Sequence, residues 1–228
     1  MNGKIGCLLI HGFAGGVHEV APLRDYLEER GFEVVCPELK GHTGNRKDLI
    51  GTNYKEWIAS AEEVLVRASS GWDKVVIIGF SMGGLIGINL LTRHKAAAFI
   101  SLCMPVVHWD IKRVFLNLLE DFKSRTFENL RHYMKSAVIP VPALLNFKVL
   151  LGKTKKLMKV VSCPVFIAQA LKDDTVHHKS AEFIYSQIGS QMKEIKYYKN
   201  SGHVICQSPD GAELFRDVEE FIRKAVVK

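Results

Sequence analysis

Residues 74–84 read KVVIIGFSMGG, an apolar run followed by a glycine-rich turn around one serine. The run is rich in β-branched residues, as in a buried strand, and residues 85–93 after it are helix-like. A serine between two such glycines, joining a strand to a helix, sits on a sharp turn that exposes its hydroxyl. Side chains at Gly79 and Gly83 would collide with that strand and helix. The stretch therefore predicts that Ser81 is a nucleophile, and the alternative is a glycine-rich turn that contains a serine by chance.

Short apolar runs with the same strand-like composition recur along the chain, at residues 5–10, 32–36, 98–103, 164–168 and 193–198. Patterns of helical period separate them, at residues 20–30, at residues 53–71 and after the start signals Ser208 and Pro209. The second of these begins with Asn53 followed by Glu56, which resembles a capping box. Strands and helices that alternate in this way are typical of βαβ units. We expect an α/β fold with a mainly parallel sheet flanked by helices.

The alternation fails between residues 104 and 162, where apolar residues from Ile111 to Phe122 mark one helix and others are scattered around Pro140 and Pro142. We interpret this segment as an insertion. The expected division is a core of residues 1–104 and 161–228 and a small helical cap, or lid, of residues 105–160. Such a cap would lie above the carboxyl ends of the strands, where open α/β sheets bind ligands.

A serine is a weak nucleophile unless a histidine takes its proton, and a carboxylate normally orients that histidine. His203 lies on a loop between the last predicted strand and the last helix, where such a base is expected. Two candidate acids, Asp173 and Asp174, follow the strand before it. We favour Asp173. Asp174 would then be a solvated loop charge, or an N-terminal cap for a helix beginning near His178.

Acyl transfer also needs N–H donors for the tetrahedral oxyanion, one from the residue after the nucleophile and one from a loop after an early strand. These donors would be Met82 and Phe13. The early loop, residues 11–16, reads HGFAGG, and its glycines let the backbone approach a substrate closely. The ring of Phe13 would either pack or line the acyl pocket. No spacing of metal ligands such as HExxH is present, and the proposed chemistry needs no cofactor.

Four segments together resemble a known family: residues 8–13, LLIHGF; residues 79–84, GFSMGG; residues 169–173, QALKD; and residues 201–204, SGHV. They look like the α/β-hydrolase fold and, more narrowly, small bacterial carboxylesterases related to monoacylglycerol lipases. The resemblance implies Asp173 as the triad acid and the amides of Phe13 and Met82 as oxyanion donors. The chain departs from the family at residues 14–16, AGG, and at Thr43, where related lipases often have glycine.

Composition limits the classes of protein to consider. The chain has 228 residues, 47% of them hydrophobic, which is enough for one domain with a sizeable core. Its five cysteines form no close-spaced pairs, so we expect reduced thiols in a cytoplasmic protein. No apolar stretch approaches the roughly 20 residues that span a bilayer, and no signal peptide is evident. We therefore expect a soluble protein.

The net charge of +7 has a local origin. Residues 106–160 hold eleven Lys or Arg and four Asp or Glu, whereas the remaining residues hold twenty of each. A nucleic-acid partner would rest on net charge alone, so we expect none. A weak contact between the basic cap and lipid surfaces is one hypothesis, and a solvated charged face is the other.

These patterns favour a serine hydrolase that cleaves a small-molecule ester, with short to medium acyl chains or a monoacylglycerol, through an acyl-enzyme. A thioesterase or another acyl hydrolase would use the same residues, because a fold does not fix a substrate. A non-catalytic ligand-binding protein on this fold is the alternative from another class. It would tolerate loss of His203 or Asp173, and both are present.

Overall fold

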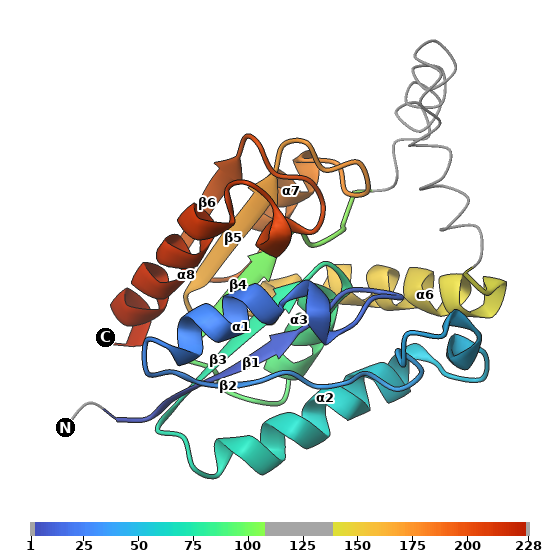
Figure 1. The fold of residues 1–228 in the computed structure, drawn as a ribbon, viewed down its shortest axis with the longest axis horizontal. Helices are drawn as coiled ribbons and strands as arrows, with labels where there is room; N and C mark the ends of the chain where they lie inside the picture. Colours follow the sequence, from blue (N-terminus) through green and yellow to red (C-terminus); the bar gives the residue numbers. More distant parts are fainter. Residues whose placement is uncertain (1–2, 108–138, 227–228) are drawn as a thin grey trace.

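A computed structural model of the chain describes residues 3–107 and 139–226. Within these residues, six strands form one sheet in the order β2-β1-β3-β4-β5-β6, and every neighbouring pair is parallel (Figure 1). The strands are β1 (Ile5–Ile10), β2 (Glu33–Val35), β3 (Lys74–Phe80), β4 (Ala98–Leu102), β5 (Val165–Ala170) and β6 (Lys193–Tyr198). The predicted parallel sheet is confirmed, with strand ends within two residues of the expected ones.

Helices cover both faces of the sheet. They are α1 (Ala21–Glu28), α2 (Tyr54–Ser69), α3 (Met82–Leu91), α6 (Val141–Leu157), α7 (Lys179–Gln187) and α8 (Gly211–Val226). Short 3₁₀ turns occupy Val17–Glu19, Arg46–Leu49, Met158–Val160 and Ile205–Gln207. One hydrophobic cluster joins α1 and α8 to one face of the sheet, and the other joins α2, α3, α6 and α7 to the opposite face.

The strands are continuous apolar runs because they are buried on both faces. In β1, Leu8 and Ile10 belong to the cluster beneath α2 and α3, whereas Cys7 and Leu9 belong to the cluster beneath α1 and α8. All four side chains are fully buried. A strand of a parallel sheet between two helical layers has no solvent-facing side, so it shows no polar alternation.

Local signals set the helix ends. The Asn53 side chain accepts hydrogen bonds from the first turn of α2, and Glu56 bonds back to the Asn53 amide, which confirms the capping box. The last helix begins at Gly211, after the predicted start signals. The predicted start signal Ser208 is instead the C-cap residue of the preceding 3₁₀ turn, and its hydroxyl donates to the Val204 carbonyl at 3.0 Å. The helix therefore begins after it.

The predicted cap is only partly described. Its helix from Ile111 to Phe122 lies outside the described residues, so the cap and its boundaries at 105–160 stay a prediction. The described part, α6, packs on α3, where Asn89 Nδ2 donates to Thr154 Oγ1 at 2.8 Å. No helix within residues 3–107 and 139–226 is long and apolar enough to cross a membrane.

The strand order reverses at β1. The chain leaves β1 for β2 on one side, and later returns to β3 on the other side. Loops that follow neighbouring strands on opposite sides of such a reversal diverge and leave a crevice at the carboxyl ends. The loop of residues 11–16 and the turn around Ser81 follow β1 and β3, so both lie at this crevice.

We predict that Gly83→Ala destabilises the fold, because a Cβ at this position would overlap the backbone of Ile10 and His11. Overpacking of this kind typically costs about 1–3 kcal/mol, which at this chain length lowers the Tm by several degrees. Thermal unfolding followed by circular dichroism measures the change.

Gly152→Ala in α6 is the matched control, because a Cβ there would meet nothing within 4 Å. Alanine is also the better helix former, so this variant should be as stable as the wild type or more so. An unchanged Tm for Gly83→Ala would contradict the crowding described at β1.

Candidate active site

Ser81 occupies the turn between β3 and α3 in a strained backbone conformation. Its φ is 51° and its ψ is −119°, and it is the N-cap residue of α3. A Cβ at Gly79 would overlap the backbone of Gly83 and Gly84. Strand and helix thus pack backbone against backbone, and the residue between them must take a left-handed φ. The Ser81 amide donates to the Leu102 carbonyl at 2.8 Å, which ties the turn to β4.

His203 lies against Ser81 although the two are far apart in the sequence. It follows β6, and its Nε2 is 3.1 Å from Ser81 Oγ. Its Nδ1 is 2.9 Å from Asp173 Oδ2. Because a carboxylate only accepts, Nδ1 carries the proton and Nε2 faces the serine as an acceptor. The ring of Phe80 lies 5.1 Å from the His203 ring and packs on it.

Asp173, rather than Asp174, is the acid that meets the histidine. It is 2% exposed, and its Oδ1 accepts from the amides of Thr175 at 2.9 Å and Val176 at 2.7 Å. Gln169 Nε2 approaches its Oδ2 at 3.4 Å. These donors fix the orientation of the carboxylate in a buried site. Asp174 instead accepts from Thr175 Oγ1 at 3.0 Å.

The alternative of Asp174 as a helix cap does not match the structure. His178 is the N-cap residue of α7, and its side chain makes no cap hydrogen bond. Asp173 was the favoured residue, and its carboxylate is the one at His203. Spacing alone does not separate the two aspartates, because both follow β5 on an irregular loop. The two amide donors to Asp173 come from the residues directly after the pair, as in an Asx turn.

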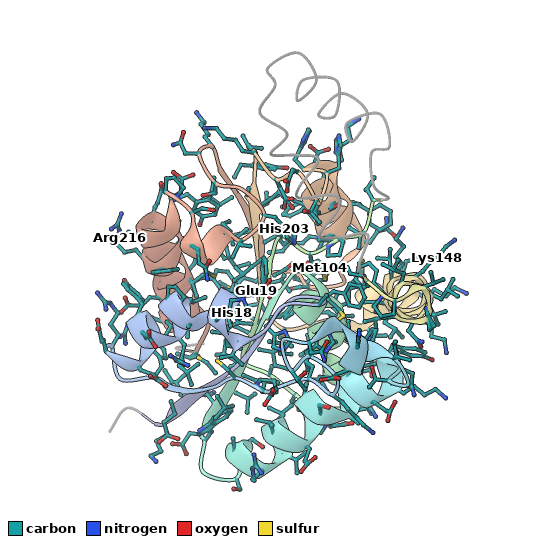
Figure 2. All side chains as sticks on the ribbon, turned by 45° about the vertical axis from the view of Figure 1, so that its right-hand side comes forward. His18, Glu19, Met104, Lys148, His203 and Arg216 are labelled. Atoms are coloured by element: carbon teal, nitrogen blue, oxygen red, sulfur yellow. The ribbon has the colours of Figure 1, made fainter. Side chains whose placement is uncertain are left out.

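The charge state of His203 reflects two opposing effects. Burial works against the charged ring, but the carboxylates of Asp173, Asp174 and Glu19 outweigh it, so the pKa of His203 is raised above its usual value of 6.5. Figure 2 shows Glu19 and His203 together near the middle of the molecule. Negative charge around the ring stabilises the protonated form that a general base becomes during catalysis.

The two expected oxyanion donors lie on the two sides of the crevice. Met82 is the first residue of α3, and Phe13 is in the loop after β1. Within the described residues neither of their N–H groups donates a hydrogen bond to the protein. The first amides of a helix also lack partners inside it, and they favour negative charge nearby.

The ring of Phe13 packs against α6. It stacks on Phe147 at 5.0 Å between centroids and lies 5.6 Å from Trp57 and 6.1 Å from His42. The described contacts therefore agree with the packing alternative for this side chain.

Sequence reasoning missed the groups that support the loop of residues 11–16. His11 is buried, its Nδ1 donates to the Gly12 carbonyl at 2.9 Å, and burial lowers its pKa to about 4. Glu19 accepts from the Gly12 amide at 3.1 Å. The available signal was an acidic residue directly after a glycine-rich loop. In the described part of the chain no group of three metal-ligating side chains is gathered, and all five cysteines are unpaired.

Comparisons with known proteins show which proteins the chain resembles. Two curated bacterial proteins each align with 98% of this chain. A carboxylesterase of Bacillus subtilis (strain 168) is 26% identical, with 94% of its length covered. A thermostable monoacylglycerol lipase of Bacillus sp. (strain H-257) is 29% identical, with 92% of its length covered.

Solved structures share the fold. One, described with the metagenome-derived lipolytic enzymes LipS and LipT, has a TM-score of 0.81 at 22% identity and covers 97% of this chain and 95% of that one. A monoacylglycerol lipase of Paleococcus ferrophilus has a TM-score of 0.72 at 15% identity, with 96% and 94% covered. A family model described as the alpha/beta hydrolase fold matches residues 8–139, more than half of the chain. With this match, and with a parallel sheet that carries Ser81 on a strained strand-to-helix turn, the chain belongs to the alpha/beta hydrolase fold family.

Proposed function

We propose that this protein is a serine hydrolase that cleaves carboxylic esters through an acyl-enzyme, with Ser81, His203 and Asp173 as its catalytic triad. The observation that carries the proposal is the pair of contacts at His203, 3.1 Å to Ser81 Oγ and 2.9 Å to Asp173 Oδ2. A non-catalytic binding protein would have no need of a base against a serine held in a strained backbone conformation. The names of the two Bacillus relatives support ester hydrolysis.

In the proposed mechanism, His203 Nε2 takes the Ser81 hydroxyl proton as the oxygen attacks the ester carbonyl carbon. Asp173 keeps the proton on Nδ1 and stabilises the charged ring. The amides of Phe13 and Met82 donate to the oxyanion of the tetrahedral intermediate. His203 then gives its proton to the departing alcohol, and an acyl group stays on Ser81. Water repeats the sequence and releases the acid.

The proposed substrates are small esters with short to medium acyl chains, or monoacylglycerols. The experiment that tests the function compares hydrolysis rates across a chain-length series of simple esters, the matching thioesters and monoacylglycerols. Faster turnover of the thioesters would replace the esterase proposal with a thioesterase. No turnover of any of the three classes would contradict an acyl hydrolase.

We predict that Ser81→Ala abolishes the burst of chromogenic alcohol from an activated ester and also abolishes labelling by a fluorophosphonate, because the covalent intermediate needs the Ser81 oxygen. The retained fold is checked by circular dichroism. Ser70→Ala, at an exposed position after α2, is the matched control and should keep the full burst. Residual burst activity in Ser81→Ala would assign the nucleophile to another residue.

We predict that Asp173→Asn lowers kcat on the order of 10³–10⁴-fold, because an amide in place of the acid no longer holds the required tautomer of His203. Asp174→Asn is the matched change next to it and should alter kcat little, since the carboxylate 2.9 Å from His203 Nδ1 is that of Asp173. Steady-state kinetics of both variants decides between the two residues. Equal losses would contradict the assignment of Asp173.

We also propose that the basic segment contacts anionic lipid surfaces weakly. The described part of it, α6, has an outer face formed by Val141, Leu144, Leu145 and Lys148 at helical spacing. Val141 is 66% exposed and Leu145 is 58% exposed, and Lys148 points away from the body in Figure 2. A helix with exposed aliphatic side chains beside lysines suits the boundary between lipid headgroups and acyl chains.

We predict that binding to vesicles containing anionic lipid exceeds binding to neutral vesicles and falls as salt is added, because salt screens the attraction. Lys148→Gln should weaken it about fivefold, since one lysine at an anionic surface contributes about 1 kcal/mol. Lys199→Gln, an exposed lysine after β6, is the control. Co-sedimentation measures both, and equal binding to the two vesicle types would contradict the contact.

A further inference from the structure

Glu19 is a partly buried carboxylate that the proposed triad does not use. It ends the short 3₁₀ turn Val17–Glu19, directly after the loop of residues 11–16 that carries the Phe13 amide. Its side chain turns back toward that loop instead of toward solvent. Figure 2 labels it near His203, on whose ring its charge acts.

The loop is folded around this carboxylate. The Gly12 amide donates to Glu19 Oε2 at 3.1 Å. A Cβ at Gly15 would overlap the carboxylate group, and a Cβ at Gly12 would lie 3.1 Å from its oxygen. The loop can close on Glu19 because its contact positions have no side chains and because Ala14 between them takes a φ of 56°. Gly12, Ala14 and Gly15 thus leave space in the loop for the Glu19 carboxylate.

The hydrogen bond between Glu19 and the Gly12 amide also bears on the next amide in the loop, that of Phe13. Gly12 and Phe13 are consecutive, so a hydrogen bond that fixes the Gly12 amide also limits rotation of the peptide that presents the Phe13 N–H. An oxyanion donor stabilises the transition state only if it already points at the place where charge develops. Glu19 would therefore affect the oxyanion site indirectly, through its hydrogen bond to the Gly12 amide.

Glu19 also faces the base. The groups that act on the His203 ring are Asp173 and Asp174 from the loop after β5 and Glu19 from the loop after β1. The groups that act on Glu19 are His203, His18 and the amides of Gly12 and Gly16. The buried Cys206 thiol is close to Glu19 but stays neutral, because burial raises its pKa to about 12.

We propose that Glu19 is a positioning residue with two separable effects: its oxygen holds the Gly12 amide and so the oxyanion donor of Phe13, and its negative charge favours protonated His203. The inference rests on the proposed function, since it assigns roles toward that reaction. Burial raises the pKa of Glu19, and the Gly12 hydrogen bond and His203 oppose that rise.

The sign of the pH effect follows from the role of the base. His203 must be neutral to accept the serine proton, so kcat/KM rises with pH through the pKa of His203 in the free enzyme. Carboxylates near the ring raise that pKa, and the midpoint of the acid limb is expected above 6.5. Removing the charge of Glu19 must therefore move the acid limb to lower pH.

Two substitutions separate the effects. Glu19→Gln removes the charge but keeps an oxygen of the same reach for the Gly12 amide, so the acid limb should move to lower pH while kcat at the plateau stays near that of the wild type. Glu19→Asp keeps the charge but withdraws the oxygen by one methylene. Its kcat should fall by about tenfold, less than the ~10²–10³ for a lost oxyanion donor, because the amide is misplaced and not removed. Its acid limb should stay closer to that of the wild type than the limb of Glu19→Gln.

Glu63→Gln is the matched control, because it makes the same change at an exposed position on α2. It should alter neither the limb nor kcat. An unmoved limb in Glu19→Gln would overturn the charge effect, and a wild-type kcat in Glu19→Asp would overturn the positioning effect.

A second readout needs no ester turnover. The His203 ring is titrated by NMR in Ser81→Ala, with and without Glu19→Gln, and its pKa should be lower when the charge is absent. If the protein cleaves no ester but this shift occurs, the proposed function fails while the charge effect of Glu19 on His203 stands. If esters are cleaved and neither the limb nor the NMR titration moves, the inference about that charge fails by itself.

Discussion

Strand β3 and helix α3 pack so closely that their backbones are in contact, and the rest of the site depends on this crowding. The two glycines that flank Ser81 have no room for a Cβ, and the single residue between strand and helix must take a positive φ. A serine held in this way has its hydroxyl at the His203 ring, with Oγ 3.1 Å from Nε2. The strain is maintained by the surrounding sheet, through the hydrogen bond from Ser81 to β4 and the contact of Gly83 with the end of β1.

The sheet then decides which other groups can reach that hydroxyl. Parallel strands end at the same edge, so the loops after β1, β5 and β6 bring Phe13, Asp173 and His203 to the turn that carries Ser81. Two of these loops are fixed by amide hydrogen bonds to a carboxylate, the loop after β5 at Asp173 and the loop after β1 at Glu19. These backbone donors have two effects. They supply hydrogen bonds to carboxylates that are wholly or partly buried, and they hold irregular segments in one conformation.

Much of this arrangement could be predicted from the sequence, and the reasons differ from element to element. The strands were predictable because burial on both faces leaves long apolar runs, and Ser81 because its turn demands glycines. Asp173 was favoured over Asp174 and the resemblance agreed, but spacing alone cannot separate two neighbouring side chains on an irregular loop. Glu19 gave only a weak signal, an acidic residue soon after a glycine-rich loop, because its role depends on a side chain that turns back toward that loop. Acyl-chain preference depends on the depth of the substrate pocket, and the pattern of apolar residues along the sequence does not give that depth.

The order of the strands also has a consequence for how the molecule acquires its reactivity. Ser81 and His203 are 122 residues apart, and the histidine follows β6, which ends the order of the described sheet and pairs with β5 alone. Contacts between distant parts of a chain form late, because the loop that joins them must first be closed. The central strands can therefore pair while the serine still lacks its base. A half-folded chain would hold a strained hydroxyl without its proposed base, so the proposed acyl transfer would wait until β6 has docked.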